Sequence, residues 1–161
     1  MLRPYQSALN AGIKASWRSG NRNVIGVLPT GGGKTVCMAS LCAENHSPQI
    51  AIAHRQELVG QISLALARSG LYHRIVAPER TIRFIVQQHM DELGNHFYQP
   101  HAELAVAGVD TLIRRTDDLA TFLKRCSLWI IDEAHHLLAE NKWGQAVKAC
   151  PNARGLGLTA T

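Results

Sequence analysis

The sequence VIGVLPTGGGKT, residues 24–35, decides the fold. It starts with an almost uninterrupted apolar run, Val24–Leu28, which is typical of a buried strand in a parallel sheet. Pro29 and three consecutive glycines end this run, and a helix is expected from Lys34 to about Asn45. A glycine-rich turn between a strand and a helix is the setting in which phosphate-binding loops occur. The segment therefore predicts an α/β fold with a phosphate site at the end of its first strand.

The residues of this loop suit a nucleotide. Gly31–Gly33 allow backbone N–H groups to turn toward phosphate oxygens, and the helix that follows adds a partial positive charge. Lys34 would reach the β- and γ-phosphates, and Thr35 would offer its hydroxyl to Mg²⁺. The strict pattern has glycine where this chain has Leu28. A glycine-rich turn without a ligand is the alternative, and the strand and helix around the loop disfavour it.

The apolar pattern on either side of the loop alternates between strands and helices. Further strands are expected at Ile50–Ala53, Arg74–Ala77, Ala102–Ala107, Leu128–Asp132 and Leu156–Leu158. Helices are expected before Gly20 with the stripe Tyr5, Leu9, Ile13 and Trp17, after Ala53 with Leu58, Ile62, Ala65 and Leu66, and over 79–93 with Ile82, Ile85, Val86 and Met90. This order predicts a parallel sheet with helices on both faces, and ligands at the carboxyl ends of its strands.

Length and composition limit the class of protein. The 161 residues correspond to a single domain, 1–161, and 46% hydrophobic with 18% charged residues is ordinary for a globular protein. Four cysteines without a CxxC pair indicate reduced thiols in an intracellular protein. The N-terminus lacks the apolar region of a signal peptide, and no apolar run is long enough to cross a bilayer.

The charge is positive and unevenly distributed. The chain carries a formal +5, and residues 1–43 hold five basic residues and no acidic one. A basic surface suits nucleic acid or phosphate ligands, and a solvated basic face is the alternative.

A second motif, SLWIIDEAHH at residues 127–136, ends an apolar run with two acids. Asp132 would hold Mg²⁺ together with Thr35, partly through water, and Glu133 would orient and deprotonate the attacking water. The alternative is a helix N-cap acid followed by a surface glutamate. His135 and His136 are adjacent and lack partners at zinc spacing, so no zinc site is expected.

With LPTGGGKT and DEAH in one chain, the sequence resembles the first RecA-like domain of superfamily two helicases of the DEAD/DEAH kind. LRPYQ (2–6) resembles the Q-motif, IAHRQELVGQ (52–61) motif Ia, VAGVDTLIRR (106–115) motif Ib and GLGLTAT (155–161) motif III. The matches stand in the family's order and extend from Leu2 to Thr161.

The resemblance implies roles for individual residues. ATP would be bound by Arg3, Gln6, Thr30, Gly31, Gly32, Gly33, Lys34 and Thr35, with Gln6 at the adenine edge. The catalytic residues would be Lys34, Asp132 and Glu133. Nucleic-acid phosphates would meet His54, Arg55, Thr111 and Arg114. His135, Thr159 and Thr161 would couple the nucleotide state to the grip on the strand.

The resemblance also implies a second RecA-like lobe, which carries the arginine finger and which we expect in the same full-length protein. The leading hypothesis is thus the ATP-binding lobe of a helicase or translocase, with DNA favoured over RNA by LRPYQ and by the His-Arg pair of motif Ia. A nucleotide- or nucleic-acid-binding module without turnover, and the motor lobe of a restriction-type translocase, are the alternatives. A small-molecule kinase is disfavoured, because DEAH and TAT stand where a kinase needs an acceptor site and a lid.

Overall fold

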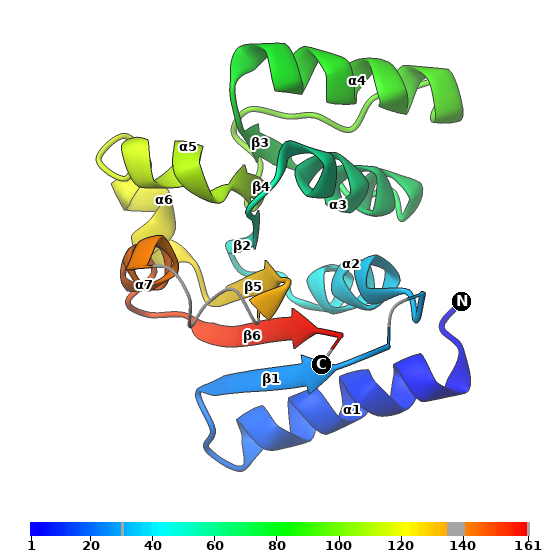
Figure 1. The fold of residues 1–161 in the computed structure, drawn as a ribbon, viewed down its shortest axis with the longest axis vertical. Helices are drawn as coiled ribbons and strands as arrows, with labels where there is room; N and C mark the ends of the chain where they lie inside the picture. The colour runs from blue at the N-terminus through cyan, green and yellow to red at the C-terminus, as the bar shows by residue number, and fades with distance from the viewer. Residues whose placement is uncertain (30, 135–140, 161) are drawn as a thin grey trace.

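A computed structural model describes residues 1–29, 31–134 and 141–160. In this part of the chain six parallel strands form one sheet in the order β1-β6-β5-β2-β4-β3 (Figure 1). The strands are β1 (Asn23–Val27), β2 (Gln49–Ala53), β3 (Arg74–Val76), β4 (Leu104–Gly108), β5 (Leu128–Asp132) and β6 (Arg154–Thr159). The helices are α1 (Pro4–Arg18), α2 (Lys34–Glu44), α3 (Gln56–Arg68), α4 (Glu79–Leu93), α5 (Val109–Arg114), α6 (Ala120–Arg125) and α7 (Asn141–Lys148). The predicted α/β class and parallel sheet are confirmed.

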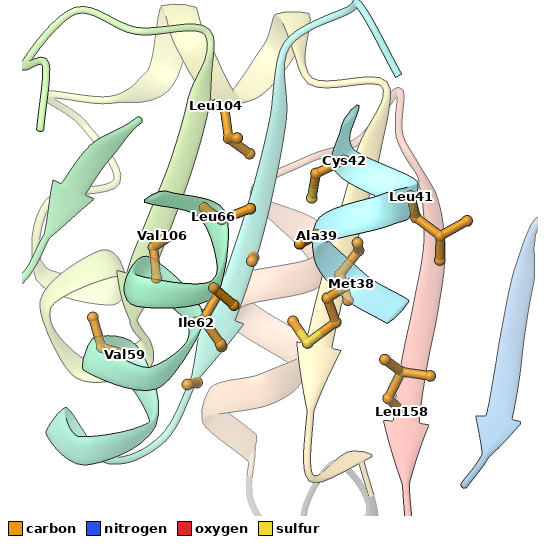
Figure 2. Close-up of a cluster of buried hydrophobic side chains, with 14 of the residues drawn as sticks. Met38, Ala39, Leu41, Cys42, Val59, Ile62, Leu66, Leu104, Val106 and Leu158 are labelled. Atoms are coloured by element: carbon orange, nitrogen blue, oxygen red, sulfur yellow. The ribbon is translucent and has the colours of Figure 1, made fainter. Parts of the chain in front are cut away.

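Helices cover both faces of the sheet, as predicted (Figure 1). Successive residues of a strand point to opposite faces, so a strand that is apolar throughout needs cover on both sides. In β5, Leu128 and Ile130 pack in the core beneath α1–α4, whereas Trp129 and Ile131 pack in the core beneath α5–α7. Figure 2 shows the first core, where α2 and α3 place their apolar side chains against the strands. Each of the strands β2, β4 and β5 has five residues, and all of them are buried.

The first strand differs from its prediction. The run Val24–Leu28 was expected to be buried, but β1 lies at the edge of the described sheet and pairs with β6. Its inner face contacts α1, where a Cβ on Gly26 would be 3.4 Å from Ile13 and Leu9. On its other face Ile25 is 66% exposed and Val27 is also exposed, because α5–α7 cover the strands farther along the sheet.

Two predicted helix faces also need correction. On α4, Met90 is exposed although it was assigned to the apolar stripe, and His89 is buried instead. On α1, Tyr5 is exposed although it begins the predicted stripe. In both cases a polar group lies in or against the core and has partners there, which apolar periodicity does not reveal.

The three helices of the second face were not predicted. α5 and α6 have six residues each and α7 has eight, so none offers the repeated turns from which a helical period is detected. None of the helices that the structure describes has the length and apolar character needed to cross a membrane.

Candidate nucleotide site and nucleic-acid edge

The glycine-rich loop joins the end of β1 to the start of α2. The N–H of Leu28 donates to the carbonyl of Thr159 at 2.9 Å, and the N–H of Gly32 donates to the carbonyl of Pro29 at 2.8 Å. Gly31 and Gly33 have φ angles of 80° and 79°, in the left-handed region that side chains other than glycine rarely adopt. The loop therefore turns tightly and delivers its backbone to the N-terminus of α2, where anions are favoured.

Gln6 fastens α1 to this loop. Its Nε2 donates to the carbonyl of Gly32 at 2.8 Å, and its Oε1 accepts from the N–H of Arg3 at 2.8 Å. The hydroxyl of Tyr5 donates to the same Gly32 carbonyl at 3.3 Å. A Cβ on Gly33 would lie 2.4 Å from Gln6 Nε2, so the approach depends on glycine. Gln6 is 4% exposed, and its contact in this structure is with the phosphate loop.

Lys34 connects the loop to the acidic pair at the end of β5. Its Nζ lies 3.2 Å from Glu133 Oε1 and 3.8 Å from Asp132 Oδ1. These residues are about a hundred positions apart in the sequence. They meet because β6 lies between β1 and β5, and all three parallel strands end at the same edge. Lys34, Asp132 and Glu133 thus form one cluster.

The two acids have different environments. Burial raises the pKa of Asp132, and the positive charge of Lys34 opposes that rise. The Asp132 side chain is 3% exposed, whereas that of Glu133 is 25% exposed. Glu133 has φ 58°, a left-handed conformation that costs on the order of 1–2 kcal/mol for a residue with a side chain. Its N–H donates to Asp132 Oδ1 at 2.9 Å. A strained backbone held by such contacts is characteristic of functional sites.

The oxygen donors at this edge fit a magnesium site of the kind that nucleotides bring with them. Mg²⁺ takes hard oxygen ligands and is commonly held by one or two carboxylates together with water and phosphate oxygens. The buried carboxylate of Asp132 and the half-buried Thr35 at the start of α2 supply such atoms. Within the described residues no group of three or more histidine, cysteine or acidic side chains could hold a metal ion by itself.

Motif Ia begins beside this cluster. The register pairs Ile52 of β2 with Ile131 of β5, so the two chains leave the sheet next to each other. The charge of His54 acts to lower the pKa of Asp132, which places this histidine within electrostatic reach of the acids. Arg55 is exposed and caps α3, with its carbonyl accepting from the N–H groups of Leu58 and Val59.

Motif Ib lies one strand farther along, at the end of β4. Arg114 is exposed on α5, and its Nη2 donates to Thr111 Oγ1 at 3.4 Å. Thr111 is buried, and the charged residues that α5 exposes are Asp110 in its first turn and Arg114 in its last. Arg55 and Arg114 thus extend from helices that begin at the carboxyl edge of adjacent strands, β2 and β4.

The remaining predicted residues have mixed outcomes. Thr159 is buried at the end of β6, and its carbonyl holds the first residue of the phosphate loop. Thr30, His135 and Thr161 lie outside the described residues. Sequence reasoning missed the contact of Gln6 and Tyr5 with Gly32, and no local pattern would have revealed it, because the partners are 26 and 27 residues apart.

Comparison with known proteins agrees with this architecture. The family model described as "Type III restriction enzyme, res subunit" matches residues 1–161. A Saccharomyces cerevisiae protein named "Putative ATP-dependent helicase IRC3" is 28% identical over 152 residues, which is 88% of this chain and 20% of that protein. The chain thus spans about a fifth of the length of this relative.

Solved structures share the fold. The UvsW helicase of bacteriophage T4 superposes with a TM-score of 0.64 at 16% identity, over 99% of this chain and 52% of that one. The helicase domain of Pyrococcus furiosus Hef gives 0.65 at 22% identity, over 99% and 32%. The Type ISP restriction-modification enzyme LlaGI, solved with a DNA substrate mimic, gives 0.68 at 15% identity, over 100% and 17%. With the family model matched from end to end, the chain belongs to the type III restriction enzyme res subunit family and has the fold of the first RecA-like lobe of superfamily two helicases.

Proposed function

We propose that this chain is the ATP-binding lobe of an ATP-dependent helicase or translocase that acts on DNA. One observation carries the proposal: Lys34 leaves the phosphate loop and faces Glu133 at 3.2 Å and Asp132 at 3.8 Å. A lysine at a helix N-terminus opposite a buried and a half-buried carboxylate is the arrangement that Mg²⁺-nucleotide hydrolysis needs.

Each residue of the cluster has one task in this proposal. Lys34 exchanges its carboxylate partners for the β- and γ-phosphates, because its ammonium group is the point charge at the mouth of the loop. Asp132 and Thr35 would hold Mg²⁺, which would supply positive charge to neutralise the phosphate oxygens. Glu133 would orient and deprotonate water, a role that its greater exposure than Asp132 supports. Gln6 and Arg3 contribute to the adenine side of the nucleotide.

The nucleic-acid part of the proposal rests on position and charge. His54 and Arg55 follow β2, and Arg114 follows β4, at the edge that carries the nucleotide cluster. Contacts of arginine with phosphates track the backbone without reading sequence. Hydrolysis and movement along the strand would require a second RecA-like lobe that closes on the nucleotide. Thr159, whose backbone carbonyl accepts from the N–H of Leu28 at 2.9 Å, would transmit the nucleotide state.

The decisive experiment is a titration of a fluorescent ATP analogue with Mg²⁺ against the wild-type protein and the Lys34→Ala variant. We expect Lys34→Ala to abolish binding or to weaken it severely. Lys14→Ala is the matched control, because Lys14 pairs with Glu44 away from the loop. Thermal unfolding of all three proteins separates lost binding from lost folding. Equal affinity of wild type and Lys34→Ala would refute the phosphate-loop assignment.

The second candidate is a translocase that moves along DNA without separating its strands, and the family match favours it. The description of the matched family names a subunit of a restriction enzyme, and LlaGI is a restriction-modification enzyme. The two activities differ in product. Displacement of a triplex-forming strand without duplex separation would indicate a translocase, and release of a single strand from a duplex would indicate a helicase. Both assays use the full-length protein with ATP and Mg²⁺.

A further inference from the structure

A cavity of about 570 Å³ lies between α3 and α4, outside the site described above. The two helices run side by side (Figure 1) and are joined by an ion pair between Arg68 and Glu92 at 2.7 Å near their C-terminal ends. Toward their N-terminal ends the groove is lined by Gly60 and Leu64 of α3 and by Phe84 and Ile85 of α4. Gly60 and Ile85 are buried, whereas Phe84 is 66% exposed. The groove therefore has an apolar floor and one aromatic ring at its rim.

The polar groups of this groove are mostly uncharged amides. Gln56, Gln61 and Gln88 line it, and Arg80 and Glu57 are the only ionisable residues among the lining groups. The two opposite charges leave the groove formally neutral. An apolar cavity with a few amide groups suits a flat, neutral ligand whose edge carries hydrogen-bond donors and acceptors. It does not suit a phosphate, which would need more than one cation.

The position of the groove connects it to the candidate nucleic-acid edge. Gln56 follows Arg55 directly, and a Cβ placed on Gly108 would be 3.7 Å from Gln56 Nε2. Gly108 is the residue from which α5, with Arg114, begins. Arg80 is in the first turn of α4 and, among the described residues, makes no ion pair, whereas its neighbour Arg83 is paired with Glu79 at 2.7 Å. Arg80 therefore adds a cation at the mouth of the groove, whose lining begins at Gln56 directly after Arg55.

The shape of the exposed apolar surface argues against a docked helix. An amphipathic helix needs a row of apolar contacts along the groove. Met90 and Leu93 are the other large exposed apolar side chains of α4, and neither lines the cavity. A single ring at the rim fits a single stacked partner.

We propose that this groove takes one base of the bound single strand, stacked on Phe84 with its edge toward the glutamine amides, while Arg80 meets the adjacent phosphate. This inference rests on the proposed function, because it needs a strand at the edge formed by Arg55 and Arg114. Stacking on an aromatic side chain is tolerant of base identity, so the Phe84 ring would contribute affinity for a strand of any sequence.

The test compares two DNA strands of equal length, one intact and one with abasic sites replacing the bases. Wild type should bind the intact strand about tenfold more tightly than the abasic strand. Phe84→Ala should bind both strands at the abasic level, and Phe84→Tyr should restore the difference. Tyr72→Ala is the matched control. Tyr72 is an exposed aromatic residue that precedes β3, so it lies at the amino ends of the strands, away from the carboxyl ends that carry Arg55 and Arg114.

Failure of this inference differs from failure of the proposed function. Arg55→Ala and Arg114→Ala should weaken binding of both strands alike, because they contact phosphates. If those two variants lose binding while Phe84→Ala keeps the wild-type preference for the intact strand, the base site is refuted and the nucleic-acid function stands. If wild type binds neither strand with or without nucleotide, both the base site and the nucleic-acid function are refuted.

Discussion

At the scale of single residues, the clearest case is a buried polar network that no motif signals. The hydroxyl of Ser63 lies 2.6 Å from His73 Nε2 and 2.9 Å from His89 Nε2. His73 Nδ1 lies 2.8 Å from the carbonyl of Leu71, which can only accept, so Nδ1 carries the proton. His89 Nδ1 accepts from the N–H of Phe97, so its Nε2 donates to Ser63. Both rings are neutral, and every polar atom of the three side chains has a partner.

This network makes stability depend on pH. Burial lowers the pKa of His73 from 6.5 to about 4, and burial also lowers the pKa of His89. A histidine whose pKa is lowered by folding favours the folded state fully above its unfolded pKa, and that contribution is lost as the pH falls through it. We expect the free energy of unfolding to drop by about 2 kcal/mol between pH 7 and pH 5 from His73 alone.

Urea unfolding at a series of pH values measures this dependence. His73→Gln removes the titrating group and should flatten the slope, whatever it does to stability at pH 7. A wild-type slope equal to that of His73→Gln would show that the buried ring does not titrate as argued.

Glu133 allows a prediction about chemistry at the same scale. Glu133→Gln keeps an oxygen that can accept from Lys34 but removes the base, so ATP binding should persist while hydrolysis falls by about 10²–10⁴ in the full-length protein. Glu44→Gln, at an exposed pair with Lys14, is the matched control. Steady-state phosphate release with a parallel binding titration measures both properties. Turnover of the variant at the wild-type rate would remove Glu133 from the role of base.

At the scale of elements, the packing of β6 on β5 depends on glycine. A Cβ on Gly155 would lie 1.9 Å from the ring of Trp129, which sits on the neighbouring strand in register with it. The Gly155 carbonyl also accepts from Trp17 Nε1 at 3.2 Å, so α1, β5 and β6 meet at this residue. An added Cβ could be accommodated only if the backbone of β6 or the rigid indole of Trp129 shifted, and neither moves easily.

Gly155→Ala should therefore destabilise the protein by about 1–3 kcal/mol, the range for overpacked cores. Gly12→Ala is the control, because Gly12 is inside α1 with nothing within 4 Å of an added Cβ. That change should stabilise by about 0.5–1 kcal/mol through helix propensity. Chemical denaturation of both variants measures the two effects. Equal midpoints for Gly155→Ala and wild type would mean that the indole can move aside.

At the scale of the whole molecule, one sheet edge carries the whole candidate site. In the order of the sheet, the cluster of Lys34, Asp132 and Glu133 lies at the ends of β1, β6 and β5. The candidate nucleic-acid contacts follow at the ends of β2 and β4. The groove between α3 and α4 is lined by the N-terminal turns of these helices, which follow β2 and β3 in the chain. We predict that the 161-residue chain folds alone, binds Mg-ATP weakly and does not unwind a duplex. One lobe leaves the far side of the nucleotide in water, and movement along a strand needs two lobes that open and close.

A strand-displacement assay with the purified chain, with an ATP titration beside it, measures this prediction. Binding to single strands should fall with added salt, as expected for a few phosphate contacts. Robust ATP-dependent unwinding by the 161-residue chain would contradict the requirement for a second lobe.

Local sequence determined several elements of this protein and the position of its glycine-rich loop. The predicted Glu79–Leu93 helix and Leu128–Asp132 strand coincide with α4 and β5, because continuous apolar runs and regular spacing are properties of neighbouring residues. The loop glycines and Lys34 were assigned for the same reason, since a phosphate loop is a contiguous segment.

Tertiary structure decided which elements became neighbours. Val24–Leu28 has the composition of a buried strand, yet the strand order leaves Ile25 of β1 66% exposed at the edge of the described sheet. Gln6 against Gly32, Ser63 between two histidines, and Glu133 in a left-handed conformation are likewise set by contacts between distant segments. The physical reason is that burial and hydrogen bonding depend on what packs against a residue, which its own neighbours in the chain do not specify.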